Sequence, residues 1–175
     1  MSDKTKFTTK DIALIGMMIA VIEVSKIALA HIPNVELTSF WIIVFTMYFG
    51  RRIWPVIPAF ILIEGLMYGF GLWWIMYLYA WPLLAVIILI IRKRKSYILC
   101  CLISGAFGLA FGFLCSFPYV FMGATGADLT TGIKVAFAWW VAGIPWDIVH
   151  GVANFIIMLV LYHPVTKIMR KLKIS

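Results

Sequence analysis

Polar side chains gather in one stretch of an otherwise apolar chain, residues 139–154. Asp147, His150 and Asn154 are spaced i, i+3, i+7, so a helix through them places all three on one face. Pro145 favours a helix that begins there, because proline at the first helical position gives up no hydrogen bond, and an acid in the first turn suits the positive end of the helix dipole. Polar side chains are costly in lipid and usually point at a cavity or a partner helix. The stretch therefore indicates one wall of a binding site.

Other polar and aromatic side chains fall at a similar level of the predicted membrane spans, in the outer half, while the inner half is apolar. This distribution favours a pocket that opens outward rather than a continuous pore. Purely structural roles for these residues stay open as alternatives. Glu23 and Lys26 could pair with each other at i, i+3. The tryptophans could form an interfacial belt, and the tyrosines could be core residues. The further candidates for substrate contact are Glu64, Tyr68, Trp73, Tyr77, Trp139, Trp140 and Trp146.

The composition places these residues in a membrane protein. The 175 residues are 64% hydrophobic and 13% charged, with a mean hydropathy of +1.03, whereas a soluble domain is about half apolar and about one quarter charged. A span needs roughly 20 apolar residues, so the length allows about six spans with short connections. We predict a single all-α membrane domain, a bundle of six transmembrane helices.

The spans are predicted at about 11–30, 37–49, 53–68, 72–91, 97–122 and 143–163, with outer loops at 31–36 and 123–142. Whether residues 135–142 begin the last span is left open. A signal peptide ending at Ala-Leu-Ala, residues 28–30, is an alternative for the first span. Glu23 and Lys26 interrupt the apolar core that a signal peptide needs, so we favour a span.

The net charge of +8 follows the topology and does not indicate nucleic acid. All Lys and Arg residues except Lys26 and Lys134 lie in the tails, which include Lys4 and Lys6, or in the connections at 51–52 and 92–95. Cytoplasmic loops carry an excess of Lys and Arg. Both termini are therefore predicted to be cytoplasmic, in a multi-pass protein of the cell membrane.

The sequence contains none of the common catalytic motifs that would indicate an enzyme. The chain contains no GxxxxGKS/T phosphate loop, no HExxH and no GxSxG. Asp147 and His150 with His31 could hold a metal, but their spacing is unspecific, and we predict neither a metal nor a cofactor bound by this chain. Energy for transport would then come from an ion gradient or from a partner that hydrolyses nucleotide.

Together these features resemble the S component, the substrate-binding subunit of vitamin importers of the energy-coupling factor (ECF) type, a class of ABC transporter. The resemblance covers the whole chain. The first span carries small residues one turn apart, Ala13, Gly16 and Ala20, although Met17 stands where the family's Ala-x-x-x-Ala pattern has its second alanine. Residues 145–150, Pro-Trp-Asp-Ile-Val-His, are similar to a Pro-x-Asp-x-x-Lys-like motif that opens the family's last span, with His replacing Lys.

The resemblance implies a function and partners. The chain would capture a small vitamin-like nutrient from outside, dock on a transmembrane coupling subunit through Ala13, Gly16, Met17 and Ala20, and rely on two ATPase subunits that use ATP. Residues 33–36, Pro-Asn-Val-Glu, would form a lid, which adds Asn34 and Glu36 to the candidate substrate-binding residues. The aromatic lining favours a flat heterocycle of thiamine, pyridoxine or pyrimidine type, while a corrinoid or a queuosine precursor stays open.

Two other functions remain as alternatives. A free-standing secondary carrier or channel for a small polar solute would need no ATPase partner. An intramembrane enzyme would use Asp147, His150 and Glu64 to turn over a lipid or peptide.

Overall fold

The computed structural model describes residues 8–125 and 128–174, and these residues form helices joined by short turns. The lysines at positions 4 and 6 therefore lie outside the described residues. In chain order the helices are α1 (Thr9–Leu29), α2 (Thr38–Phe49), α3 (Ile53–Tyr68), α4 (Leu72–Ile91), α5 (Tyr97–Gly123) and α6 (Leu129–Ile174), with 3₁₀ turns η1 (Gly50–Arg52) and η2 (Arg92–Arg94).

Five helical segments of the described chain are long and apolar enough to cross a membrane, which is compatible with a multi-pass membrane protein. α2 and α3 count together as one of them, Thr38–Tyr68, with 31 residues. The 12 residues of α2 rise only about 18 Å, less than the roughly 30 Å of a hydrocarbon core. The predicted separate spans at 37–49 and 53–68 thus correspond to two helices of one hairpin, of which α2 is short.

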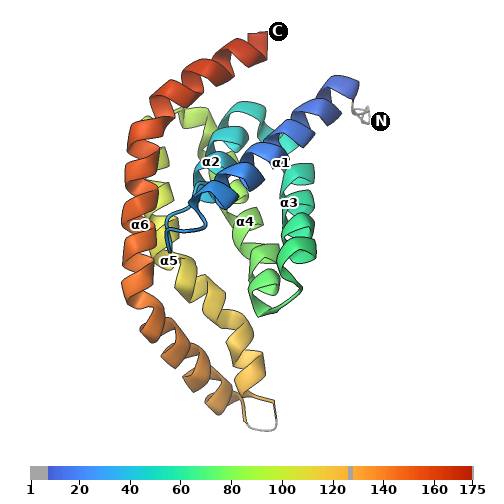
Figure 1. Cartoon of the computed structure of the whole chain (residues 1–175). Helices are drawn as coiled ribbons and strands as arrows, with labels where there is room; N and C mark the ends of the chain where they lie inside the picture. Colours follow the sequence, from blue (N-terminus) through green and yellow to red (C-terminus); the bar gives the residue numbers. More distant parts are fainter. Residues whose placement is uncertain (1–7, 126–127, 175) are drawn as a thin grey trace.

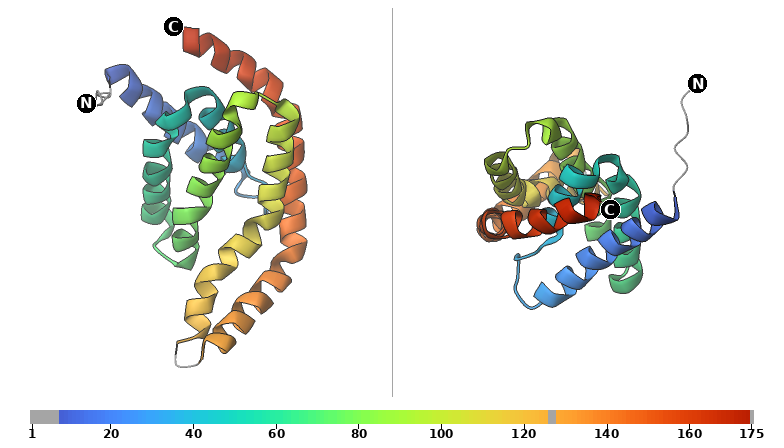
Figure 2. Two further views of the ribbon diagram at one scale, coloured as in Figure 1. Left: turned by 180° about the vertical axis from the view of Figure 1, so that it is seen from behind. Right: turned by 90° about the horizontal axis from the view of Figure 1, so that it is seen from above.

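α2 lies at the centre of the bundle. It packs against α1, α3, α4, α5 and α6, and the residues from Thr38 to Thr46 are buried apart from the partly exposed Trp41. Its sequence explains this position, because a helix that is hydrophobic all round has no face suited to water. α1 lies along one side of the bundle, as Figure 2 shows.

The basic turns η1 and η2 and the described ends of the chain lie at one end of the bundle (Figure 1). Helix α1 begins there with a capping box, in which the Thr8 side chain accepts a hydrogen bond from the Asp11 backbone and the Asp11 side chain accepts one from the Thr8 backbone. α2 ends at Phe49 and is followed by Gly50, whose φ of 59° is readily available only to glycine. This glycine turns the chain back into α3.

The prediction of an outer loop over residues 123–142 is wrong from residue 129 onward. Residues 129–142 are helical and belong to α6, which has 46 residues and contains Pro145 in its interior. Packing on α5 explains the difference: Trp139 stacks on Tyr119 with ring centroids 4.5 Å apart, and Trp140 meets Phe113 edge to face at 5.2 Å. This long α5–α6 hairpin extends beyond the connection between α3 and α4 (Figures 1 and 2).

Candidate binding site

A cavity of about 150 Å³ lies where the loop before α2 meets the bundle. Residues from α1, this loop, α2, α4, α5 and α6 contribute to its wall. They are Lys26, Asn34, Glu36, Thr38, Tyr77, Trp81, Phe111 and His150. The cavity is therefore lined by both candidates from the predicted lid, Asn34 and Glu36, and by two of the other candidates, Tyr77 and His150.

Glu36 joins the loop to two helices. Its carboxylate accepts hydrogen bonds from the backbone N–H of Thr38, from the backbone N–H of Ser39 at 3.1 Å and from the Ser39 hydroxyl at 2.6 Å. These contacts cap the start of α2, where the helix dipole favours a negative charge. A fourth contact joins Glu36 Oε1 to His150 Nε2 of α6 at 3.2 Å. Burial raises the pKa of Glu36, but the contacts with His150, Ser39 and Thr38 outweigh burial and hold its pKa at about 2.

The stability of the chain should consequently depend on pH through Glu36. The folded-state pKa of about 2 lies below the ordinary value of 4.5, so the stabilisation is complete above pH 4.5 and is lost as the pH falls toward 2. We expect Glu36→Gln to lower the free energy of unfolding by roughly 2 kcal/mol at pH 7. Thermal unfolding of both proteins in detergent between pH 7 and pH 2.5 measures this difference, which should shrink below pH 4.5. A difference that stays constant with pH would contradict the assignment.

Lys26 makes an ion pair with Glu64 that joins α1 to α3. Glu64 is 1% exposed, and the Lys26 ammonium also lies 3.3 Å from the hydroxyl of Tyr77. The alternative pairing of Glu23 with Lys26 is not the one found, and the Glu23 carboxylate has no hydrogen-bond partner among the described residues. Glu64 thus contacts the cavity through Lys26 and does not line it directly.

The three polar residues of α6 face the bundle but reach different neighbours. His150 points at the cavity and Glu36. Asp147 accepts a hydrogen bond from the backbone N–H of Gly112 in α5 at 2.9 Å, and the Asn154 amide donates to the Ser39 hydroxyl of α2 at 3.2 Å. Along α6, this face therefore contacts first α5, then the cavity and then α2.

Two rings of an aromatic row on α4, those of Tyr77 and Trp81, supply one side of the cavity, and Trp73 at the start of the row does not line it. Trp73, Tyr77 and Trp81 are spaced four residues apart, and each ring meets the next edge to face at 5.3 Å. Trp81 also packs on Phe111 of α5 at 5.4 Å. The indole N–H of Trp81 is buried and has no hydrogen-bond partner among the described residues. Buried donors are nearly always paired, so this N–H is an exception among the described residues.

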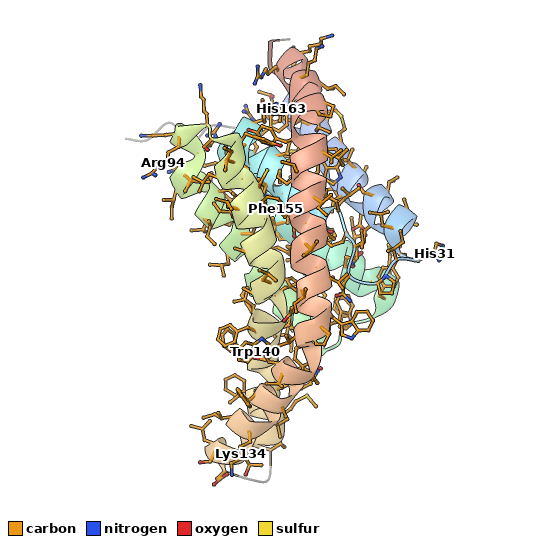
Figure 3. All side chains as sticks on the ribbon, turned by 90° about the vertical axis from the view of Figure 1, so that its left-hand side faces the viewer. His31, Arg94, Lys134, Trp140, Phe155 and His163 are labelled. Atoms are coloured by element: carbon orange, nitrogen blue, oxygen red, sulfur yellow. The ribbon has the colours of Figure 1, made fainter. Side chains whose placement is uncertain are left out.

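The other aromatic candidates do not line the cavity. Trp139 and Trp140 pack on α5 in the extended part of the hairpin, where Figure 3 shows Trp140 between Lys134 and the middle of α6. Trp146 is 54% exposed. Tyr68 is 55% exposed, but its ring centroid lies 5.6 Å from Lys26 Nζ, so Tyr68 contacts a lining residue without lining the cavity itself. The exposure of Trp146 and the packing of Trp139 and Trp140 suit the interfacial interpretation of the tryptophans.

Four lining residues were not among the candidates: Lys26, Thr38, Trp81 and Phe111. Trp81 could have been found, because it continues the i, i+4 row that starts at Trp73. Thr38 and Phe111 carry no such signal in the sequence. They line the cavity because α2 and α5 pack beside it.

Metal ligands do not cluster in the described part of the chain. No group of three His, Cys, Asp or Glu side chains there lies close enough to hold an ion.

The small residues of α1 face outward. Ala13, Gly16, Met17 and Ala20 are all exposed, and a Cβ at position 16 would meet nothing within 4 Å. This strip of α1 is therefore open to a partner or to lipid.

Comparison of the chain with protein-family models, with curated proteins and with solved structures finds no match. The functional conclusion therefore depends on the cavity and on the surfaces around it.

Proposed function

We propose that this chain is the substrate-binding subunit of an importer of the ECF type, which captures a small aromatic heterocyclic nutrient from outside the cell. The observation that carries the proposal is the cavity, on which polar and aromatic side chains from six segments of the chain converge. It lies at the start of α2, about 18 Å along that helix from the basic turn η1. By the positive-inside rule the basic end faces the cytoplasm, so the cavity belongs to the outer half of the protein.

The lining favours a flat ring that is neutral or positively charged. Tyr77, Trp81 and Phe111 offer aromatic faces and edges for a ring, and the unpaired indole N–H of Trp81 suits a ring nitrogen or oxygen acceptor. Glu36 is ionised at neutral pH, and the charge of Lys26 is already matched by Glu64. The volume of about 150 Å³ is below the common range of roughly 300–1,000 Å³ for ligand pockets. A single pyridine or pyrimidine ring fits this space best, and a larger ligand would need the loop before α2 to move.

The exposed strip of α1 supports a partner in the membrane. Small residues let a second helix approach closely, and Ala13, Gly16 and Ala20 present such a surface on the outside of the bundle. A transmembrane coupling subunit with two ATPase subunits would supply the energy, since the sequence contains no phosphate loop.

Binding is tested with the purified full chain. Mass spectrometry of the small molecules that copurify with it, followed by calorimetric titration with thiamine, pyridoxine and free pyrimidines, should identify one compound with a Kd between nanomolar and micromolar. Failure of all these compounds, together with no ATPase subunits in pull-downs from native membranes, would contradict the proposal. Uptake driven by a gradient into vesicles that hold this chain alone would identify a secondary carrier instead.

Trp81→Leu should weaken binding of the identified compound at least tenfold, about 1.4 kcal/mol, because it removes both a stacking surface and a buried donor. Trp54→Leu is the matched control: Trp54 lies in the first turn of α3 next to η1 and is 39% exposed. We expect it to leave the Kd unchanged. Equal losses in the two variants would show that Trp81 does not contact the ligand.

A further inference from the structure

A second and larger pocket, of about 640 Å³, lies at the basic end of the bundle. It is formed by the end of α2, the turn after α4 and the last part of α6, and it shares no lining residue with the first cavity. Its lining residues are Met47, Tyr48, Arg92, Lys93, Lys95, Tyr162 and Arg170.

Arg92 fixes the wall of this pocket. Its guanidinium donates to the backbone oxygen of Met47 at 2.9 Å and to that of Tyr48 at 3.4 Å. It thus supplies hydrogen-bond donors to two carbonyl groups in the last turn of α2, which have no partner within the helix. The guanidinium lies so close to Gly50 that a Cβ at this position would clash with Arg92 Nη1. The glycine that turns α2 into α3 therefore also makes room for this side chain.

Positive charge around the pocket is not balanced by acid. Lys93, Lys95 and Arg170 are exposed, and no carboxylate of the described residues lines the pocket. Asp11, at the same end of the bundle, is already paired with Arg52 at 2.6 Å. The positive-inside rule explains why basic residues lie at this end, but it does not require two distant segments to direct them toward one concave site.

We propose that this pocket binds a phosphate group, carried either by the headgroup of an anionic phospholipid or by a soluble anion. Arg and Lys are the usual donors to phosphate, and basic pockets between helices on the cytoplasmic side bind anionic headgroups. The hydroxyl of Tyr48, which lies 3.5 Å from Arg170 Nε, adds a neutral donor. Tyr48 and Tyr162 also suit the level of the lipid headgroups, where tyrosine is enriched.

The test uses the full chain in an uncharged detergent. Its thermal unfolding is followed during titration with dioctanoyl phosphatidylglycerol, with dioctanoyl phosphatidylcholine and with inorganic phosphate. The pocket variant carries Lys93→Gln, Lys95→Asn and Arg170→Gln; asparagine is chosen because residue 95 has a φ of 49°, which asparagine tolerates. The matched control carries Arg51→Gln, Lys167→Gln and Lys171→Gln, which remove the same charge from exposed positions at the same end outside the pocket.

We expect the wild-type chain to respond to phosphatidylglycerol or to phosphate at least tenfold more strongly than to phosphatidylcholine. The pocket variant should lose about tenfold in affinity and the control less than about threefold. A response to phosphatidylglycerol that exceeds the response to phosphate identifies a headgroup, and a response to phosphate without one to phosphatidylglycerol identifies a soluble anion. Equal losses in the two variants, or no selective response of the wild-type chain, would overturn the proposal. Because all the replaced side chains are exposed, unfolding midpoints without additive should match the wild type, and native mass spectrometry at room temperature provides a second measurement if they do not.

Discussion

Lys26→Met is expected to lower the free energy of unfolding by about 3–5 kcal/mol, the range found when one partner of a buried ion pair is removed. The variant leaves the carboxylate of Glu64 without its cation at a position that is 1% exposed. The loss should also loosen α1 from α3, because this ion pair joins the two helices.

A double-mutant cycle separates the pair from the packing around it. Glu64→Met alone should also destabilise, whereas the double variant with methionine at both positions should recover most of the loss, since two apolar side chains need no charge partner. Lys134→Met is the matched control, because Lys134 is exposed near the start of α6. Denaturant unfolding of the wild type, the two single variants and the double variant measures the coupling energy between Lys26 and Glu64. A double variant as unstable as the sum of the single variants would show that the two charges do not stabilise each other.

The sequence predicted those features that depend on local composition. Long apolar runs separated by glycine or basic residues predicted helices close to Thr38–Phe49, Ile53–Tyr68 and Leu72–Ile91, because each boundary coincides with a residue that ends a helix or prefers water. The shared face of Asp147 and His150 followed from helical spacing, and both are buried in the bundle.

Features that depend on contacts between distant segments could not be predicted in this way. Glu23 was a plausible partner for Lys26 by spacing, but the packing of α1 on α3 brings Glu64 to Lys26 instead. Pro145 indicated the start of a helix, yet α6 begins at Leu129. A proline costs an interior hydrogen bond, and aromatic packing of the preceding turns on α5 offsets that cost.

Gly108→Ala is expected to destabilise the chain by about 3 kcal/mol, the upper end of the range for overpacking. A Cβ at this position would lie 2.7 Å from Cα and 2.8 Å from the backbone nitrogen of Gly151 in α6. Backbone atoms cannot rotate away as a side chain can, so α5 and α6 would have to move apart. The antiparallel contact of these helices is visible in Figure 3.

The same displacement should weaken ligand binding, because His150 precedes Gly151 on α6 and meets both Phe111, with ring centroids 5.0 Å apart, and Glu36. Gly16→Ala is the matched control for stability: a Cβ there meets nothing within 4 Å, and alanine favours a helix over glycine by about 1 kcal/mol. Thermal unfolding and calorimetric titration should therefore show Gly108→Ala with a lowered midpoint and a raised Kd, and Gly16→Ala with a midpoint at or above that of the wild type. A Gly108→Ala protein as stable as the wild type would mean that the two helices tolerate a wider separation, and the close contact would then not position His150.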